Sequence, residues 1–348
     1  MAVINPVFGK ELKKYGAFDF NACYNCGNCT AVCSLSTEED SFPRDMVRMS
    51  VLGLEGEIKS SLKPWLCYYC GECSTHCPQE ANPGELMMSL RRWLTAQYDW
   101  TKLSGLLYRN LPATILAFLA VAAAVIIMGI RESFNLESMM HIGHTFEAVA
   151  ILAVFSVILI PNIIRMWWFI ILKPGTYVPV KRYFIALKEL IIHMFTQKNT
   201  LSCGEEWLRW FEHLILVIGY LTLLITTVVF NWFSSENIFI IIAGYFESAV
   251  ILIVTAHFII SRTQKKKEIN KFSQPSDWLF VVWLSLMGVS AFGVRLFIDL
   301  GILENNIWLY IVHIIILAQW ALIIVPFGKW THFLYRSFAM YFSRLRNE

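Results

Sequence analysis

The sequence has few charged residues, and those it has are unevenly spread. Charged residues make up 16% of the 348 residues, against roughly 25% in ordinary globular proteins. Residues 1–110 carry 23 of the 55 charged side chains, so residues 111–348 hold only 32 in more than twice the length. This distribution excludes a single soluble globule and a disordered chain, and it predicts a water-soluble head followed by a membrane body.

Cysteine is almost absent outside one short region. Eight of the nine cysteines lie between Cys23 and Cys77, and only Cys203 lies elsewhere. Residues 1–14 are charged and have no apolar core, so they predict no signal peptide. A head in the reducing cytosol is not expected to form disulfides, so metal ligation is the expected use of these cysteines.

The shortage of charge is matched by long hydrophobic runs. Hydrophobic residues make up 56% of the chain. Six stretches are long enough to cross a hydrocarbon core of about 30 Å. They are Leu111–Ile130, Ile142–Leu172, Leu208–Phe230, Ile238–Ile260, Trp278–Leu300 and Asn306–Gly328. Pro161 lies inside the second stretch, so we expect that helix to be tilted or kinked.

Basic residues next to these stretches predict how the chain is oriented. The loops at 173–207 and 261–277 and the C-terminal tail carry fourteen Lys or Arg residues, and the three opposite loops carry only Arg131. The head, the basic loops and both termini should therefore face the cytoplasm from the inner (cytoplasmic) membrane. The net charge of +3 is thus a topology signal and predicts no nucleic-acid partner. A contact with anionic lipid is a second use open to the basic run around Lys266.

Two copies of a four-cysteine motif dominate the head. Their spacing, CxxCxxCxxxC with a proline after the second copy, is typical of 4Fe–4S ligation, in which the fourth cysteine of each run binds the other cluster. Two zinc sites are the alternative, but these usually take two CxxC pairs each. The predicted ligands are Cys23, Cys26, Cys29 and Cys77 for one cluster, and Cys67, Cys70, Cys73 and Cys33 for the other.

The fold class predicted for the whole chain is all-α. Residues 83–108 are expected to form one helix leading into the membrane, and no alternating strand pattern occurs in the head. Residues 1–105 should form a cytoplasmic, α-helical two-cluster ferredoxin domain. Residues 106–335 should form a six-helix transmembrane haem-binding bundle of the cytochrome b type, and residues 336–348 a cytoplasmic tail.

Histidines in the membrane body suggest haem b. An ionisable side chain in hydrocarbon is costly, and axial haem ligation is the favoured role beside an electron-carrying head. His313 and His332 are about 28 Å apart along a helix at 1.5 Å per residue, so they belong to two different haems. Near the inner face, His213 or His257 is available to pair with His332. Near the outer face, His144 or His141 is available to pair with His313.

We predict an inner haem held by His213 and His332 and an outer haem held by His144 and His313. Gly219, one and a half turns after His213, is expected to let the flat ring approach. Interhelical hydrogen bonding is the plain alternative for each histidine. Glu147 lies one turn from His144, where a carboxylate can exchange protons with a quinone. His193 and Cys203 are open to roles beside a quinone or a partner, with structural roles favoured.

Several segments resemble known electron-transfer subunits. The run from Cys67 to Met88, followed by Arg91-Arg92-Trp93, resembles the C subunit of heterodisulfide reductases. The segments 193–219 and 326–336 resemble the E subunit of those enzymes and the gamma subunit of respiratory nitrate reductase. A fusion of these parts resembles the QmoC family, the membrane subunits of quinone-interacting membrane-bound oxidoreductase complexes.

This resemblance implies a menaquinone-linked electron carrier. Its implied partners are two cytoplasmic flavin and iron–sulfur subunits, QmoA-like and QmoB-like, and the electrons would serve adenylylsulfate reductase in sulfur metabolism. The nitrate reductase gamma pattern has a second haem histidine about ten residues after the one matching His213, and this chain has Leu223 there. The outer haem therefore needs a ligand from elsewhere.

The combined prediction is a membrane subunit that moves electrons between quinone, haems, two 4Fe–4S clusters and cytoplasmic partners. A passive redox anchor without its own quinone site is one alternative. A heterodisulfide- or thiol-disulfide-reducing complex is another, although this chain has no adjacent cysteines of the kind found in such catalytic subunits. The direction of electron flow is left open by the sequence.

Overall fold

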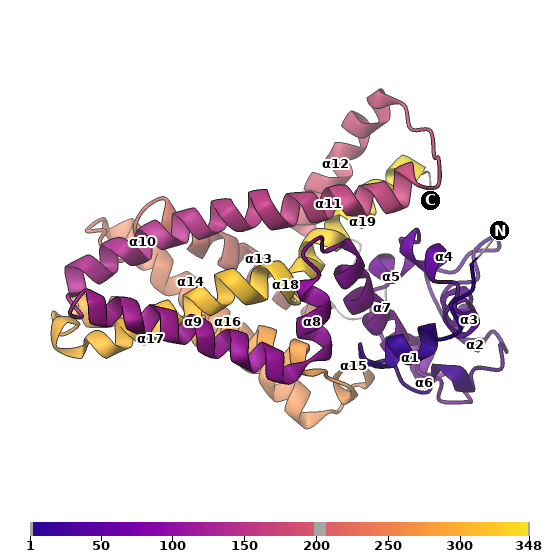
Figure 1. Cartoon of the computed structure of the whole chain (residues 1–348), viewed down its shortest axis with the longest axis horizontal. Coiled ribbons are helices and arrows are strands. Elements are labelled where there is room, and N and C mark those ends of the chain that lie inside the picture. Colours follow the sequence, from indigo (N-terminus) through magenta and orange to yellow (C-terminus); the bar gives the residue numbers. More distant parts are fainter. Residues whose placement is uncertain (1–2, 198–206, 347–348) are drawn as a thin grey trace.

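A small helical head stands at one end of a long bundle of helices (Figure 1). The computed structural model describes residues 3–197 and 207–346, and these ranges contain helices and no strand. The predicted all-α fold is therefore confirmed for the described residues. Cys203 and Lys198 lie outside the described residues.

The head is built from short helices around one hydrophobic core. The side chains of Phe8, Met46, Trp65 and Trp93 are fully buried there, and their burial supplies most of the stabilisation that such short helices cannot generate themselves. The helices are α1 (Phe8–Lys13), α2 (Asn28–Ala31), α3 (Arg44–Leu52), α4 (Glu55–Lys59), α5 (Lys63–Leu66), α6 (Glu72–Thr75) and α7 (Pro83–Tyr98), with a 3₁₀ turn at Phe20–Ala22.

The single helix predicted over 83–108 is wrong, because the chain breaks after Tyr98. The Asp99 carboxylate accepts hydrogen bonds from the backbone N–H of Thr101 at 2.9 Å and of Ser104 at 2.7 Å. It thereby satisfies the free donors at the start of the next helix, α8 (Leu103–Arg109). This turn directs the chain from the head into the bundle.

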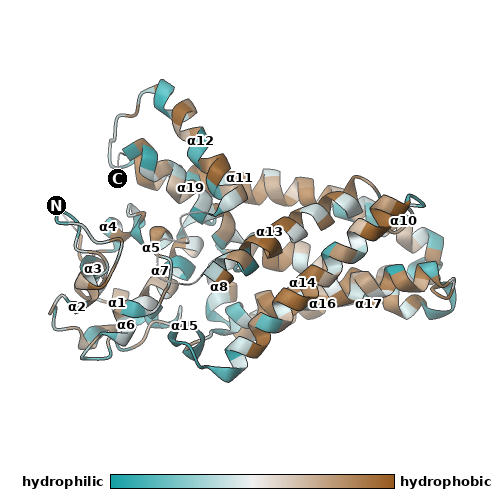
Figure 2. Cartoon of the chain, turned by 180° about the vertical axis from the view of Figure 1, so that it is seen from behind, coloured by the Kyte–Doolittle hydropathy of each residue, from teal (hydrophilic) through white to brown (hydrophobic). Residues whose placement is uncertain are grey.

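Six helices in the described ranges are long and apolar enough to cross a membrane, as predicted. Figure 2 shows hydrophobic residues concentrated in the bundle and hydrophilic ones around the head. The helices are α9 (Leu111–Arg131), the continuous run 136–172, α13 (Trp207–Val228), α14 (Ile238–Gln264), α16 (Pro275–Asp299) and the run that starts at 304. The second run begins six residues before the predicted start, because Asn135 caps it by accepting from Ser138 N–H.

Two of these runs contain π-helical turns. The second run consists of α10 (Leu136–Ala153), the π turn η2 (Val154–Leu159), α11 (Ile160–Trp167) and a further π turn, η3 (Trp168–Leu172). The sixth consists of α17 (Ile307–Gln319), the π turn η6 (Trp320–Ile324) and α18 (Val325–Phe327). Pro161, where a kink was expected, lies in the first turn of α11, directly after η2.

The sixth run turns at Gly328 and restarts as α19 (Thr331–Arg346). A Cβ at Gly328 would lie 2.7 Å from the carbonyl oxygen of Ile324, so a larger residue does not fit this turn. Helix α19 packs against α12 (Val180–Thr196) and α5 and buries Tyr335, Ala339 and Leu345 in the head core. Residues 336–346, expected as a tail, thus belong to a packed helix.

Candidate metal centres and their contact with the bundle

The two cysteine runs adopt the same local backbone. Gly27 and Gly71 have φ of 93° and 92°, and Asn25 and Tyr69 have φ of 65° and 55°. Each run then forms a single helical turn, α2 or α6. Left-handed backbone is easily adopted by glycine and costly for most other residues. The duplicated sequence motif is therefore a duplicated structure.

Backbone N–H groups point at cysteine sulfurs in both runs. Asn25 N–H donates to Cys23 Sγ at 3.4 Å, and Tyr69 N–H donates to Cys67 Sγ at 3.3 Å. Hydrogen bonds to sulfur stabilise thiolate ligands and tune the potential of an iron–sulfur cluster. The loops thus have the donors that a cluster requires.

Cysteines from the two runs gather in two mixed groups. Cys33 of the first run lines one cavity together with Cys67, Cys70 and Cys73 of the second. Burial raises the pKa of Cys33 to about 11, and the charges of Cys67 and Cys70 also raise it. Burial and the neighbouring charge of Cys23 raise the pKa of Cys29, and Cys26 and Cys77 contribute in the same direction.

The exchange of fourth cysteines stays a prediction from the motif, and the position of Cys33 beside Cys67, Cys70 and Cys73 is compatible with it. In the described ranges, no three His, Cys, Asp or Glu side chains converge on a position for a single metal ion. A cubane is wider than one ion and keeps its four sulfur ligands apart. The cavity lined by Cys33, Cys67, Cys70 and Cys73 is small, about 20 Å³, so ligation of a cubane there stays a prediction from the motif.

The two groups differ in their exposure. Cys26 is exposed, and the neighbouring Tyr24 has 59% of its surface accessible. Each group has one buried cysteine, Cys29 or Cys67, and the group of Cys67 has no exposed one. The group containing Cys23, Cys26, Cys29 and Cys77 therefore lies at the surface of the head, and the other lies deeper.

The deeper group contacts the bundle directly. From α13, the Arg209 guanidinium donates to the carbonyl oxygen of Tyr69 at 3.1 Å. A Cβ at Gly71 would lie 3.0 Å from the side chain of Glu268, in the short helix α15 (Glu268–Lys271) between α14 and α16. Two membrane-side elements thus hold the loop of Cys67–Cys77.

Buried charges join the head to the bundle. Arg92 of α7 donates to Asp277 Oδ2 of α16 at 2.9 Å, and Lys329 lies 2.8 Å from the other carboxylate oxygen. Arg91 donates through Nε to the carbonyl oxygen of Pro64 at 2.6 Å and also bonds the carbonyl of Cys67. Buried charges need such partners, because an unpaired one would be strongly destabilising.

His213 and His332 approach each other at this contact. A positive charge on either imidazole would act on the other, and the cations Arg91, Arg336 and Lys329 lie within electrostatic range of His332. Two imidazoles from separate helices with cations around them fit haem b, whose propionates pair with such cations. The nearest side chain to the position of a Cβ on Gly219 is Val250 of α14, at 3.5 Å, so the approach of a flat ring at Gly219 stays a prediction.

The remaining candidate histidines have other surroundings. His257 lies 2.7 Å from Glu212 Oε1 through Nδ1 and 3.3 Å from Ser261 Oγ through Nε2, so both ring nitrogens are engaged. His76 is exposed beside Glu72. His193 is buried on α12, where burial and the charge of Arg336 lower its pKa to about 4, so the imidazole is neutral at pH 7.

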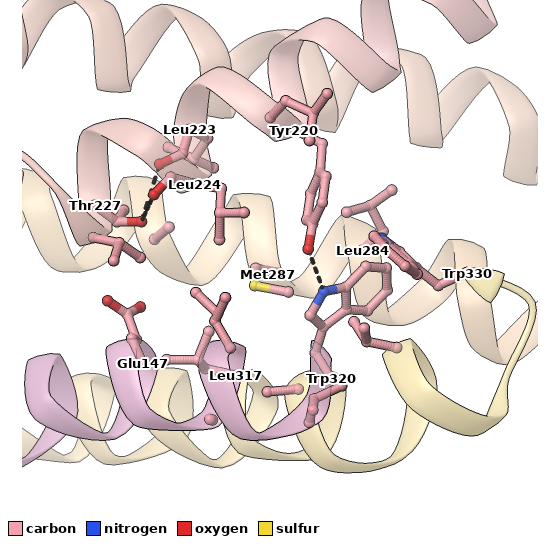
Figure 3. A pocket seen from close by; sticks show the side chains of 18 of the residues that line it. Glu147, Tyr220, Leu223, Leu224, Thr227, Leu284, Met287, Leu317, Trp320 and Trp330 are labelled. Atoms are coloured by element: carbon pink, nitrogen blue, oxygen red, sulfur yellow. Dashed lines mark hydrogen bonds between the residues drawn. The ribbon is translucent and has the colours of Figure 1, made fainter. Parts of the chain in front are cut away.

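His313 faces an apolar cavity of about 310 Å³ inside the bundle. Its Nδ1 is hydrogen-bonded to Ser290 Oγ at 2.9 Å. The cavity is also lined by Leu223 and Glu147 (Figure 3), and His144 is not among its lining residues. The structure therefore places His313 near Leu223, where the gamma-subunit pattern has its second histidine, and does not bring His144 to the same cavity.

Comparisons with known proteins agree with the geometry of the head. A family model described as "4Fe-4S dicluster domain" matches residues 22–82. The chain is 30% identical over 88 residues to the heterodisulfide reductase C-subunit-like protein of Archaeoglobus profundus, covering 25% of this chain and 47% of that one. It is 32% identical over 77 residues to the iron–sulfur C subunit of the CoB–CoM heterodisulfide reductase of Methanopyrus kandleri, covering 22% and 38%.

The N-terminal region is a 4Fe–4S domain like that of the heterodisulfide reductase C subunit. This HdrC-like domain, residues 22–82 by its family match, carries all eight clustered cysteines. The chain spans less than half the length of these curated relatives. No solved structure matches the chain.

Sequence reasoning missed the residues that join the HdrC-like domain to the bundle. Trp65 contacts His332 with a ring-centroid distance of 6.0 Å, and Arg91 and Arg209 bind carbonyl oxygens of the second cysteine loop. The only available signal was position, since Trp65 lies two residues before Cys67 and Arg209 four before His213. Tryptophan and arginine side chains have many other common roles, so these positions in the sequence alone did not identify a contact between the head and the bundle.

Proposed function

We propose that this chain is the membrane electron-transfer subunit of a quinone-linked oxidoreductase. Electrons pass between menaquinone in the bilayer, haem b, two 4Fe–4S clusters and cytoplasmic flavin and iron–sulfur subunits. When bound, the clusters and the haem accept and donate single electrons. The HdrC-like domain supports the part of the proposal that concerns the clusters. The six apolar helices support the part that concerns the membrane.

The observation that carries the proposal is the contact between the deeper cysteine group and the inner histidines. Trp65 precedes Cys67 by two residues and contacts the His332 ring. Arg209, four residues before His213, holds the carbonyl of Tyr69. Residues expected to ligate a cubane and residues expected to ligate haem are therefore connected through side chains in direct contact.

The two cysteine groups give the route a direction in space. The group of Cys33, Cys67, Cys70 and Cys73 adjoins the bundle and would exchange electrons with the haem. The group around the exposed Cys26 lies at the head surface, where a partner protein would exchange electrons. Arg91 keeps the backbone at Cys67 in place.

His213 and His332 are the proposed ligands of the inner haem. Arg336 and Lys329 lie close enough to interact with their charges, and would pair with propionates. An outer haem held by His144 and His313 stays a prediction. Because Gly143 packs directly on Tyr310, 2.4 Å from where its Cβ would be, α10 and α17 leave little room for a porphyrin at that level.

The proposed location is the inner (cytoplasmic) membrane, with the head and both termini on the cytoplasmic side. The head, α12, α15 and α19 lie at the same end of the bundle (Figure 1). The basic loops are on that side too, and an excess of Lys and Arg marks the cytoplasmic face.

The proposed partners are QmoA-like and QmoB-like flavin and iron–sulfur subunits, with adenylylsulfate reductase as the enzyme served in sulfur metabolism. The resemblance of the whole chain to the QmoC family supports this choice. The names of the curated relatives favour a second candidate, the membrane subunit of a heterodisulfide reductase-type complex. Identification of the proteins that co-purify with the chain distinguishes the two.

The function is tested by adding a menaquinol analogue anaerobically to the complex purified in phospholipid nanodiscs. Reduction of the b haem, read in the visible spectrum, and of the clusters, read by electron paramagnetic resonance, is the expected result. If dithionite reduces these centres and the quinol does not, the chain is a passive anchor and the proposal is wrong.

A further inference from the structure

The bundle contains a large apolar cavity that the proposed haem and clusters do not use. It lies between α10, α13, α16 and the sixth run and has a volume of about 310 Å³, within the range of small-molecule sites. Its wall is made of aliphatic and aromatic side chains, among them Leu224, Met287 and Leu317 (Figure 3). A ligand of this cavity should therefore be apolar over most of its surface.

Polar side chains interrupt that apolar wall, among them Glu147, Tyr220 and His313. Glu147 extends from α10 toward Thr227 and Leu224 of α13, and Tyr220 of α13 points across the cavity to Trp320 (Figure 3). The indole N–H of Trp320 donates to Tyr220 Oη at 3.2 Å, so the hydroxyl keeps its own proton to donate. A few placed polar groups in an apolar wall are typical of sites that orient a ligand.

The third polar group, His313, presents a nitrogen that can accept a proton. Ser290 Oγ lies 2.9 Å from His313 Nδ1 and 3.2 Å from the carbonyl oxygen of Met287, and with its hydrogen given to that carbonyl it accepts from Nδ1–H. In a neutral imidazole, Nε2 is then the acceptor. The cavity thus has a carboxyl, a phenol and an imidazole on different helices.

The cavity lacks the second ligand that a bis-histidine haem needs. Leu223 stands on the α13 wall, and the one histidine lining the cavity is His313. Both π-helical turns η2 and η6 border the cavity, through Val154 and Trp320. Such turns recur at functional sites.

We infer that this cavity binds the ring of a lipid quinone and that Glu147 exchanges a proton with it. The inference rests on the proposed function, and it assigns the quinone substrate of that function to this cavity. Oxidation of the quinol breaks two O–H bonds and gives a quinone, two protons and two electrons. One proton goes to the Glu147 carboxylate and the other to His313 Nε2. The two electrons would leave one at a time to one-electron oxidants, namely the b haem that His213 and His332 would hold and the clusters that the cysteines would hold. Reduction runs the same steps backwards.

The cavity also reaches the electron route. Trp330 and Phe333 line its inner end, and Phe333 is the neighbour of His332. At the level of Leu223 the cavity is ten residues beyond His213, about 15 Å along α13. A quinone ring in the cavity and a haem on His213 and His332 are therefore neighbours.

The test uses the whole complex in phospholipid nanodiscs and an azido-naphthoquinone as photolabel. Labelled peptides are mapped by mass spectrometry in the wild type and in two phenylalanine variants of α10. Ala150→Phe fills the cavity, because Ala150 lines it and is buried. Ala148→Phe is the matched control, because Ala148 is exposed on the same helix. The expected result is labelling of α10, α13 or the sixth run in the wild type and in Ala148→Phe, and its loss in Ala150→Phe.

A second pair of variants tests the carboxyl. Glu147→Gln should slow haem reduction by quinol about a hundredfold, the usual size of general acid–base catalysis, with labelling and dithionite reduction unchanged. Glu247→Gln should leave the rate unchanged, because Glu247 bonds Thr226 and does not line the cavity.

Two results would overturn the inference while leaving the proposed function intact. One is two b haems per wild-type chain, one of them lost in His313→Ala, since the cavity would then hold a haem. The other is quinol-dependent reduction with labelling confined to peptides outside the cavity. Failure of the quinol to reduce any centre in the wild type would instead remove the proposed function itself.

Discussion

The indole of Trp65 lies 6.0 Å, centroid to centroid, from the imidazole of His332. Trp65 belongs to α5 of the head, directly before the second cysteine run, and His332 begins the helix α19 that follows the membrane crossings. Trp65 is fully buried and also contacts Tyr335 at 5.3 Å. The contact joins two segments more than 260 residues apart and ties the head to the bundle.

Replacing His332 with Ala should remove one b-type haem and leave both clusters intact. The reason is that His332 and His213 are the proposed ligands of the inner haem. Haem is measured by the pyridine haemochrome spectrum and the clusters by electron paramagnetic resonance. His257→Ala is the matched control, because Glu212 and Ser261 occupy both its ring nitrogens. Equal haem content in the two variants would contradict the ligand assignment.

Replacing Cys33 with Ala should damage the cluster built mainly from the second run. Cys33 shares a cavity with Cys67, Cys70 and Cys73, although it belongs to the first run by sequence. The reduced complex is measured by electron paramagnetic resonance. The Cys33→Ala variant should lose the same cluster signal as Cys70→Ala, and it should keep the signal that is lost in Cys26→Ala. Loss of the latter signal alone would show that each run binds its own cluster.

Replacing Asp277 with Asn should destabilise the contact between head and bundle. Asp277 is buried and pairs with the buried Arg92 and the part-exposed Lys329, so its loss leaves one buried cation without its carboxylate, at a cost of about 3–5 kcal/mol. Thermal bleaching of the clusters measures the effect. Asp40→Asn is the control, with an expected cost below about 1 kcal/mol, because its partner Lys63 is part-exposed and keeps Asp45. Similar bleaching temperatures for the two variants would show that the pairing is unimportant.

Glu85 should make the head less stable as the pH rises. Burial raises its pKa to about 8, and the charge of Asp277 acts in the same direction. A carboxyl with a raised folded-state pKa binds an extra proton when folded, so the free energy of unfolding falls between the unfolded pKa and about pH 8. The loss is about 1.4 kcal/mol per pKa unit.

Urea-induced loss of cluster absorbance, followed from pH 5 to pH 8, measures this effect. The wild type should lose stability across that range, and Glu85→Gln should lose less because its amide does not titrate. Parallel curves for the two proteins would mean that Glu85 is already ionised in the folded head.

Features set by local sequence could be predicted. The membrane helices follow from long apolar runs, because nothing else satisfies the backbone of such segments in lipid. The boundaries shifted where a capping side chain intervened, as at Asn135. At Asp99 the carboxylate was free to accept from N–H groups of the following turn, and it ended the helix that periodicity alone would extend.

Features set by contacts between distant segments could not be predicted. His257 was a candidate ligand until the structure placed Glu212 beside it, and no spacing in the sequence relates those two helices. In the same way, the packing of α19 on the head depends on a turn at Gly328 and on complementary apolar faces. The sequence showed that Leu223 departs from the histidine of the nitrate reductase gamma pattern. Only the structure showed that Leu223 lines the same cavity as His313.

We propose that this one chain binds iron centres both in its head and in its membrane bundle. Counting these centres in the purified chain tests the proposal most directly. The purified chain, produced with full iron and haem supply, is analysed for non-haem iron, acid-labile sulfide and haem, alongside its visible spectrum. The account predicts about eight non-haem irons in two cubanes together with a low-spin b-type Soret band. A protein with neither cubane iron nor that band would contradict it.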